Sequence, residues 1–351
     1  MSTLSRHAVA ADHVFDGMVV HRNAAVVIAD GRVAGLVPRA ELPPAMTVRT
    51  LPDGAWLAPG FIDLQVNGGG DVLFNDAPTQ ASITAIAAVA MLVDRNPSVL
   101  GIHLEGPFLS PEKPGVHDPR ALRAPTAEDL KTLTRPRNGA MLVTLAPERV
   151  PDGFIRQLTA AGIRVSLGHS MATYDEARAA MAEGATGVTH LFNAMRPLAS
   201  REGGLIAAAL ESPDAWFGMI VDGIHVDPAM LRLALRGAAR PMLVTDAMPP
   251  VGGPRPSFTL AGEEITVRDG RCVRRDGALA GALLDMSAAV RNCVRLLGLP
   301  LEAALRLASS HPADFIGLGH RLGRLAPHYR ADMVALDPDD VRVIETWVAG
   351  A

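Results

Sequence analysis

The chain has 351 residues, of which 48% are hydrophobic and 20% are charged. This composition can fill a large packed core, and it excludes a predominantly disordered chain. The formal net charge is -4, and the 33 basic and 37 acidic residues form no long runs. We therefore expect a small-molecule partner rather than nucleic acid or an anionic membrane. The length suits two ordinary domains, or one α/β barrel with an accessory domain, for which it is a little short.

The chain also lacks the sequence features of membrane and disulfide-rich proteins. No apolar run approaches the roughly 18 residues of a spanning helix, and residues 1–15 contain no stretch typical of a secretory signal. We expect a cytoplasmic protein. The two cysteines, Cys272 and Cys293, are too few for a disulfide framework or a thiolate cluster. A bound metal would therefore depend on histidine and carboxylate side chains.

Both ends of the chain are rich in predicted strands. Residues 24–28 and 32–37 flank an Asp-Gly turn, and residues 331–336 and 341–348 form a second such pair. This distribution predicts a small β-sandwich domain assembled from residues 1–55 and 321–351. Residues 56–320 would then form the catalytic domain.

The middle of the chain alternates short β-branched runs with Ala/Leu-rich helical stretches, which is typical of βα units around a parallel sheet. We count seven strands, at residues 61–66, 99–104, 141–145, 164–167, 187–191, 216–221 and 241–245. Helices are predicted between most of them, at residues 83–95, 127–134, 174–183 and 228–236. A hairpin at 258–273 and two helices at 285–297 and 301–310 follow.

Polar and ionisable residues directly follow these strands, where an α/β barrel places its active site. Glu105, His169 and His190 come from three different strand ends. Alone, each histidine is compatible with an ordinary hydrogen-bonded core residue. Together, two imidazoles and one carboxylate can fill three positions around a divalent ion and leave one open for water.

Two further residues near these strand ends have alternative interpretations. Asp246 follows the last strand, where a carboxylate could take a proton from water and pass it to a leaving group. It could equally be a helix N-cap or a turn residue. His103 shares a strand face with Glu105, and we expect it to support that ligand rather than bind metal.

Several ordered motifs carry a specific resemblance. They are PGFIDLQVNG (59–68), FND (74–76), HLEGPF (103–108), GHS (168–170), THLFNAM (189–195), DGIHV (222–226) and LVTDAM (243–248). This set, which spans most of the chain, resembles the N-acetylglucosamine-6-phosphate deacetylases of the amidohydrolase superfamily. The resemblance implies a TIM-like (β/α) barrel, metal-dependent removal of acetate from N-acetylglucosamine 6-phosphate, and a homodimer.

The resemblance also implies roles for individual residues. Glu105, His169 and His190 would hold the metal, and Asp246 would be the general base that later protonates the departing amine. His117, which follows Val116, matches a family histidine near the substrate carbonyl. The remaining substrate contacts would come from Val116, Asn193, Ala194, Arg201, Asp222, His225, Leu279, Ala280 and Gly281, with Arg201 and His225 recognising the phosphate. Residue chemistry alone does not choose between Arg196 and Arg201.

The first strand departs from a common amidohydrolase pattern. Many superfamily members carry His-x-His there and use it for a second metal, whereas this chain has Gln65-Val66-Asn67. Because neutral amides are poor ligands for transition metals, we expect one divalent ion per chain. Zinc is our first expectation, although iron, cobalt and manganese accept the same ligands.

A second departure concerns the barrel itself. The family places a complete strand and its helix between the FND and HLEGPF motifs, but only residues 77–98 lie there in this chain. The barrel is therefore predicted to lack its second strand, which would leave two unpaired strand edges. Two alternatives to the main function stay open. One is an amidohydrolase acting on N-acetylgalactosamine 6-phosphate or a cyclic amide, and the other is a non-catalytic sugar-phosphate-binding protein.

Overall fold

The computed structural model describes residues 6–67, 93, 95–251, 253, 256–260 and 262–351. The chain divides into two compact units, and each is described here by itself. One unit comprises Met1–Asp63 with Met286–Ala351, and the other comprises Leu64–Asp285. The domain boundaries predicted from the sequence stay a prediction.

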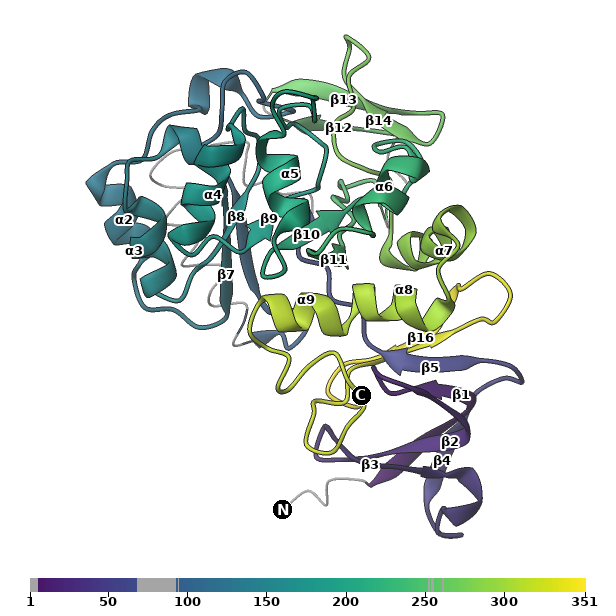
Figure 1. Ribbon diagram of the computed structural model, residues 1–351. Helices are drawn as coiled ribbons and strands as arrows, with labels where there is room; N and C mark the ends of the chain where they lie inside the picture. Colours follow the sequence, from purple (N-terminus) through teal and green to yellow (C-terminus); the bar gives the residue numbers. More distant parts are fainter. Residues whose placement is uncertain (1–5, 68–92, 94, 252, 254–255, 261) are drawn as a thin grey trace. The chain divides into compact units, whose positions relative to one another are not determined.

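The Leu64–Asp285 unit is built around a six-stranded parallel sheet (Figure 1). Six of the seven predicted strands form, and each pairs with the next one along the chain, as consecutive βα units do. Their bounds are β6 Gly101–Glu105, β7 Ala140–Leu145, β8 Arg164–Leu167, β9 Gly187–Val188, β10 Trp216–Met219 and β11 Arg240–Leu243. The predicted α/β class with a parallel sheet is confirmed.

The remaining predicted strand, the first along the chain at residues 61–66, does not form, and this prediction is wrong. Its segment makes only an isolated parallel bridge, from Val66 to Ala247 just beyond β11. On its other side, the Leu64 carbonyl lies 2.9 Å from Nδ1 of His103 in β6. Within the described residues, strand pairing runs from β6 to β11 without closing into a barrel. The predicted helix at 83–95 and most of the shortened segment 77–98 lie outside the described residues.

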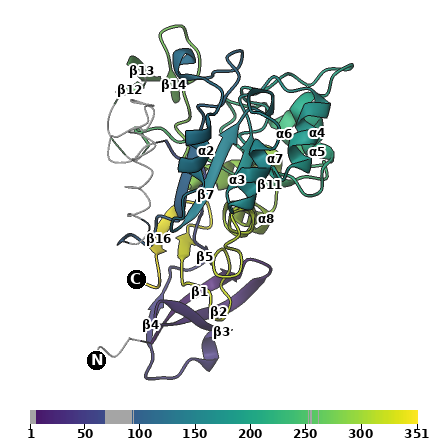
Figure 2. The same cartoon turned by 90° about the vertical axis from the view of Figure 1, so that its left-hand side faces the viewer.

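Helices between the strands begin where their sequences provide caps. Thr126 and Thr173 form capping boxes with Asp129 and Glu176, and Asp227 caps α6. In the two views the helices α4 and α5 lie over the same face of the sheet (Figures 1 and 2). The helix bounds are α2 Ala127–Leu133, α3 Phe154–Ala160, α4 Tyr174–Ala182, α5 Gly204–Glu211 and α6 Pro228–Ala234.

The predicted hairpin after the parallel sheet has one strand more than expected. It is a three-stranded antiparallel sheet of β12 Ser257–Leu260, β13 Glu263–Arg268 and β14 Arg271–Val273. Its apolar side packs in a small core of buried side chains, namely Met248, Leu260, Ile265, Cys272 and Ala280. This core therefore joins the sheet to the chain directly after Asp246.

The other unit contains a seven-stranded sheet made from both ends of the chain. The strands are β1 His7–Phe15, β2 Val20–Ala29, β3 Arg32–Pro38, β4 Thr47–Thr50, β5 Trp56–Pro59, β15 Met333–Leu336 and β16 Val343–Trp347. Strand β1 pairs with β2, β4 and β5, and its alternate residues enter two apolar cores, one containing Val9 and the other Ala10. Residues on both faces of β1 are therefore buried, as in a strand that is covered on both sides.

Three helices complete this unit, namely α7 Met286–Leu297, α8 Leu301–Ala308 and α9 Ser310–Phe315. The first two match the helices predicted at 285–297 and 301–310. Among the helices that the structure describes, none has the length and apolar character needed to cross a lipid bilayer.

Candidate active site

The ends of three strands of one parallel sheet, β6, β8 and β9, bring Glu105, His169 and His190 together. Glu105 is the last residue of β6, and the histidines follow β8 and β9. Oε1 of Glu105 lies 3.0 Å from Nε2 of His190 and 3.3 Å from Nε2 of His169. The two Nε2 atoms are 3.1 Å apart. The structure therefore brings together the three residues that the sequence analysis grouped, and they could hold a metal ion.

Three of the residues at these strand ends have a strained backbone, which fixes the direction of their side chains. His169, His190 and Asp246 have φ values of 47°, 31° and 51°, in the left-handed region that non-glycine residues rarely adopt. Such conformations persist only where the surrounding structure holds them, and they concentrate at functional sites. The backbone geometry therefore supports a functional role for this edge of the sheet.

The donor set fits a divalent metal ion. Nδ1 of His169 lies 2.8 Å from the Lys113 carbonyl, and a carbonyl only accepts, so Nδ1 carries a proton. When the ring is neutral, as a metal ligand must be, the lone pair is on Nε2, and when the ring is charged the same Nε2 donates to Glu105. Although burial opposes the ionisation of Glu105, hydrogen bonds from His169 and His190 hold the pKa of its carboxyl well below its usual range. Two imidazole nitrogens and an ionised carboxylate are the ligands of a catalytic site with an open position.

Asp246 lies beside this cluster, and two amides hold its carboxylate. Its Oδ1 accepts hydrogen bonds from Nδ2 of Asn67 at 2.7 Å and Nε2 of Gln65 at 3.2 Å. Burial raises the pKa of Asp246, and the negative charge of Glu105 adds to the rise. Within the described residues no helix starts at Asp246, so the N-cap alternative does not apply.

His117 completes the polar group around Glu105. Its Nε2 lies 3.8 Å from Oε2 of Glu105, and its ring meets that of His169 edge to face at 4.9 Å. Burial, followed by the positive charge of His169, lowers the pKa of His117 to about 4. His117 is therefore a neutral imidazole near pH 7, and its Nε2 is buried without a hydrogen-bond partner among the described residues.

A chain of buried hydroxyl groups below the cluster was not predicted. His103 Nδ1 donates to the Leu64 carbonyl, so its Nε2 accepts the hydrogen of Thr144 Oγ1 at 2.8 Å. The Thr144 hydroxyl is hydrogen-bonded to the Thr189 hydroxyl, with 2.6 Å between the oxygens, and the Thr189 hydroxyl is hydrogen-bonded to that of Ser166 at 2.7 Å. His103 thus hydrogen-bonds Leu64 and Thr144 rather than Glu105, and it lies outside the group that could hold a metal. Hydroxyl residues inside strands carry no distinctive sequence pattern.

Four of the residues predicted to contact the sugar or the phosphate follow β9 and β10. Asn193 donates from Nδ2 to the His190 carbonyl at 3.2 Å, and the Ala194 carbonyl accepts from the Ser170 amide. Asp222 and His225 form a pair with 2.6 Å between Oδ2 and Nδ1. Although burial opposes it, the hydrogen bond from His225 lowers the pKa of Asp222.

The two arginines that the sequence left open differ in their contacts. Arg196 donates from Nε to the Met171 carbonyl at 2.8 Å, whereas Arg201 is exposed in the loop before α5. Arg196 is therefore engaged by the backbone. Arg201 remains the arginine with an exposed side chain in this loop.

The predicted loop Leu279-Ala280-Gly281 lies against the chain after Asp246. Ala280 is fully buried, and Val116 packs against the same small core. The amide of Ala282 donates to the Asp246 carbonyl at 2.9 Å. At Gly281, where φ is 65°, a Cβ would lie 2.5 Å from Cγ of Met248, so the close approach requires glycine.

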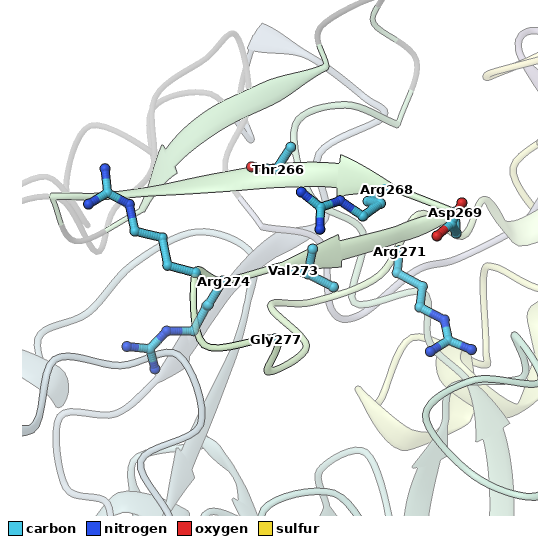
Figure 3. A pocket seen from close by; sticks show the side chains of 8 residues that line it. Thr266, Arg268, Asp269, Arg271, Val273, Arg274 and Gly277 are labelled. Carbon is cyan, nitrogen blue, oxygen red and sulfur yellow. The ribbon is translucent and has the colours of Figure 1, made fainter.

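A separate cavity lies on the three-stranded sheet. It has a volume of about 650 Å³ and is lined by Thr266, Arg268, Asp269, Arg271, Val273, Arg274, Arg275 and Gly277. No predicted site residue lines it. The labelled arginine side chains fan out rather than converge (Figure 3), and Arg274 is paired with Glu263 at 2.8 Å. The cavity is therefore distinct from the cluster around Glu105.

Comparisons with known proteins agree with this geometry. The model of the Amidohydrolase family matches residues 73–351. The N-acetylgalactosamine-6-phosphate deacetylase of Shewanella sp. (strain ANA-3) is 38% identical over 360 residues, covering 93% of this chain and 90% of the relative. That alignment is longer than this entire chain of 351 residues, so the relative has residues without a counterpart here.

Two solved structures are similar over almost the full length. The N-acetylglucosamine-6-phosphate deacetylase from Pasteurella multocida is 33% identical, with a TM-score of 0.93 and 98% of each chain covered. A mutant of the Mycobacterium smegmatis N-acetyl-D-glucosamine-6-phosphate deacetylase, in complex with N-acetyl-D-glucosamine-6-phosphate, is also 33% identical. Its TM-score is 0.87, and 99% of this chain and 98% of that chain are covered.

Proposed function

Because this chain belongs to the amidohydrolase family, we propose that it catalyses metal-dependent hydrolysis of the acetamide of N-acetyl-D-glucosamine 6-phosphate. The products are D-glucosamine 6-phosphate and acetate, as in amino sugar catabolism. The observation that carries the proposal is the convergence of Glu105, His169 and His190 next to Asp246, at the strand ends that hold the shared motifs. Two similar structures belong to proteins with this activity in their names.

Glu105, His169 and His190 would hold one divalent ion, with zinc as our first candidate. Bound there, the ion would lower the pKa of a water molecule and polarise the amide carbonyl. Iron, cobalt and manganese accept the same nitrogen and oxygen ligands. Gln65 and Asn67 present their NH₂ groups to carboxylates, so the side of each amide that faces the cluster carries no lone pair for a second ion.

Asp246 would act as the base and then as the acid. Its carboxylate takes a proton from the attacking water as the new C–O bond forms at the acetyl carbon. When the C–N bond breaks, the same group passes that proton to the departing amine nitrogen. The raised pKa of Asp246 suits this second step, because it makes the carboxylate a better proton carrier than an ordinary aspartate.

His117 would stabilise the oxygen that becomes negative in the tetrahedral intermediate. Because its imidazole is neutral near pH 7, it can donate one hydrogen bond without bringing a full charge into the site. Its unpartnered Nε2 is the atom available for that bond.

The substrate contacts follow from the placement of the other strand-end residues. Asn193 and Ala194 lie three and four residues after the ligand His190 and would contact the sugar, together with Val116 and the loop Leu279-Ala280-Gly281. Arg201 and His225 would bind the phosphate, with Asp222 orienting the imidazole of His225. Arginine suits a phosphate monoester because its guanidinium offers two parallel donors.

A second candidate substrate is N-acetylgalactosamine 6-phosphate. It is favoured by the name of the Shewanella relative, which is more identical to this chain than either solved structure. The two substrates differ only in the configuration of one hydroxyl group. Initial rates of acetate release with both, at matched concentrations, identify the preferred one.

We further propose a barrel that lacks its second strand, together with a small β domain made from both chain ends. The missing strand is supported by the excess length of the Shewanella alignment and by the direct contact between His103 and Leu64. A homodimer and a cytoplasmic location belong to the same proposal, and two free, buried cysteines suit a reducing compartment. Light scattering on the purified protein tests the dimer.

Acetate release from the two sugar phosphates, their unphosphorylated forms and a cyclic amide tests the function. We expect turnover of a phosphorylated N-acetyl sugar and preferential loss of phosphorylated substrates in Arg201→Ala. Turnover of the cyclic amide alone would favour a different amidohydrolase. Binding of metal and sugar phosphate without any turnover would favour the non-catalytic alternative.

A further inference from the structure

We propose that Asn67 is a positioning residue that orients the carboxylate of Asp246 for proton transfer. The inference rests on the proposed function of Asp246 and extends it to a residue with no assigned role. Asn67 stands where many amidohydrolases carry a metal-binding histidine. Its contacts point to a different task in this chain.

The hydrogen-bond chemistry fixes which side of the amide faces Asp246. Nδ2 of Asn67 lies 2.7 Å from Oδ1 of Asp246, and an ionised carboxylate can only accept. The NH₂ group must therefore face the carboxylate, and the amide oxygen must point elsewhere. Asn67 thus acts as a donor to the base.

This contact leaves one oxygen of Asp246 for chemistry. Oδ1 accepts from both Asn67 and Gln65, whereas Oδ2 has no hydrogen bond from any described residue. Holding Oδ1 prevents rotation about the bond to Cγ and so fixes where Oδ2 points. Proton transfer depends steeply on such orientation, since a displacement of about 1 Å can cost about 100-fold in rate.

The backbones of the two segments that carry Asn67 and Asp246 are also hydrogen-bonded to each other. The Asp246 amide donates to the Gln65 carbonyl at 2.9 Å, and the Asn67 amide donates to the Ala247 carbonyl at 2.8 Å. Asp246 itself keeps a left-handed φ of 51°. Asn67 therefore makes its side-chain contact from a segment whose register against residues 246 and 247 is fixed.

A substitution at Asn67 tests the positioning of Asp246 separately from metal binding, whereas a substitution at Gln65 would not. The Gln65 amide also reaches both carboxylate oxygens of Glu105, at 3.3 and 3.4 Å, so its loss would disturb a metal ligand. The only side-chain hydrogen bond that Asn67 makes among the described residues is with Asp246. A change at Asn67 should therefore alter turnover without altering metal content.

The test compares Asn67→Ala and Asn67→Asp with the wild type, each as full-length, metal-loaded protein. We expect Asn67→Ala to lower kcat about 10- to 100-fold, with KM and metal per chain unchanged, because only the orientation of the base is lost. Asn67→Asp should lower kcat further, since it replaces the donor by a second carboxylate. Asn96→Ala, at an exposed turn, is the matched control and should leave kcat unchanged.

A double-mutant cycle separates positioning from a general structural role. In an Asp246→Asn background, Asn67→Ala should cost less than about twofold, because its effect acts through the lost carboxylate. Equal kcat in wild type and Asn67→Ala, full additivity in the cycle, or loss of metal from Asn67→Ala each overturns the inference. If the wild type releases no acetate from either sugar phosphate, the proposed function fails, and the catalytic role of Asn67 fails with it.

Discussion

The cluster around Glu105 and the sheet made from both chain ends use their residues in opposite ways. In the cluster, polar side chains converge on strained backbone, with two imidazole nitrogens 3.1 Å apart beside a carboxylate. In the seven-stranded sheet, fully buried apolar residues such as Val9 and Leu57 pack in a continuous core. The first arrangement costs folding free energy and gains reactivity, and the second supplies stability without chemistry.

Removing the metal should have the largest effect on the cluster. Chelation should abolish acetate release, and re-addition of one equivalent of a divalent ion should restore it, because three ligand atoms converge there. His169→Ala should lose the ion and the activity together. Metal analysis by mass spectrometry should give one ion per chain. Two tightly held ions would contradict the donor role assigned to Gln65 and Asn67.

The substitution Asp246→Asn should have the second-largest effect on activity. Loss of the base should lower kcat by about 10²- to 10⁴-fold, while metal content and folding stay intact. Steady-state kinetics on metal-loaded protein, with circular dichroism as a folding check, measure this effect. Unchanged kcat would refute the assignment of Asp246 as the base.

Leu57→Ala, in the seven-stranded sheet, should lower stability and leave activity unchanged, which is the opposite of the effects expected in the cluster. Leu57 is fully buried in β5, so its truncation should lower the free energy of unfolding by about 2–5 kcal/mol. The folded molecules should keep the wild-type kcat. Leu233→Ala is the control, because Leu233 is 56% exposed on α6 and should change stability by less than about 0.5 kcal/mol. Urea denaturation and acetate release on the same samples decide the comparison.

The two regions also differ in how well the sequence predicts them. Glu105, His169 and His190 were predictable because each stands at or just after the end of a strand, and the ends of parallel strands meet at one edge. The contacts of Gln65 and Asn67 with Asp246 were not, because they join residues far apart in sequence through neutral amides that lack a motif of their own. Strand β1 was missed since its buried residues face both cores and therefore show no clear alternation.

The smallest predicted effect concerns the start of α2, away from both regions. Arg123 holds Asp129 through two hydrogen bonds of 2.6 and 2.7 Å, and Thr126 donates to the same carboxylate. Although burial opposes ionisation, these bonds lower the pKa of Asp129 to about 2. An unfolded aspartate has a pKa near 3.9, so the pair stabilises the fold fully above about pH 4 and loses its effect as pH falls toward 2.

Asp129→Asn should therefore destabilise the protein by about 1 kcal/mol at pH 7, a value discounted because Arg123 is partly exposed. The difference from wild type should shrink between pH 4 and pH 2, as the wild-type carboxylate becomes protonated. Urea midpoints at pH 7, 4 and 3 measure it, with the exposed Asp152→Asn as control. A difference that stays constant with pH would show that Asp129 acts through hydrogen bonding alone. In either case kcat should not change, because none of these groups contacts the cluster around Glu105.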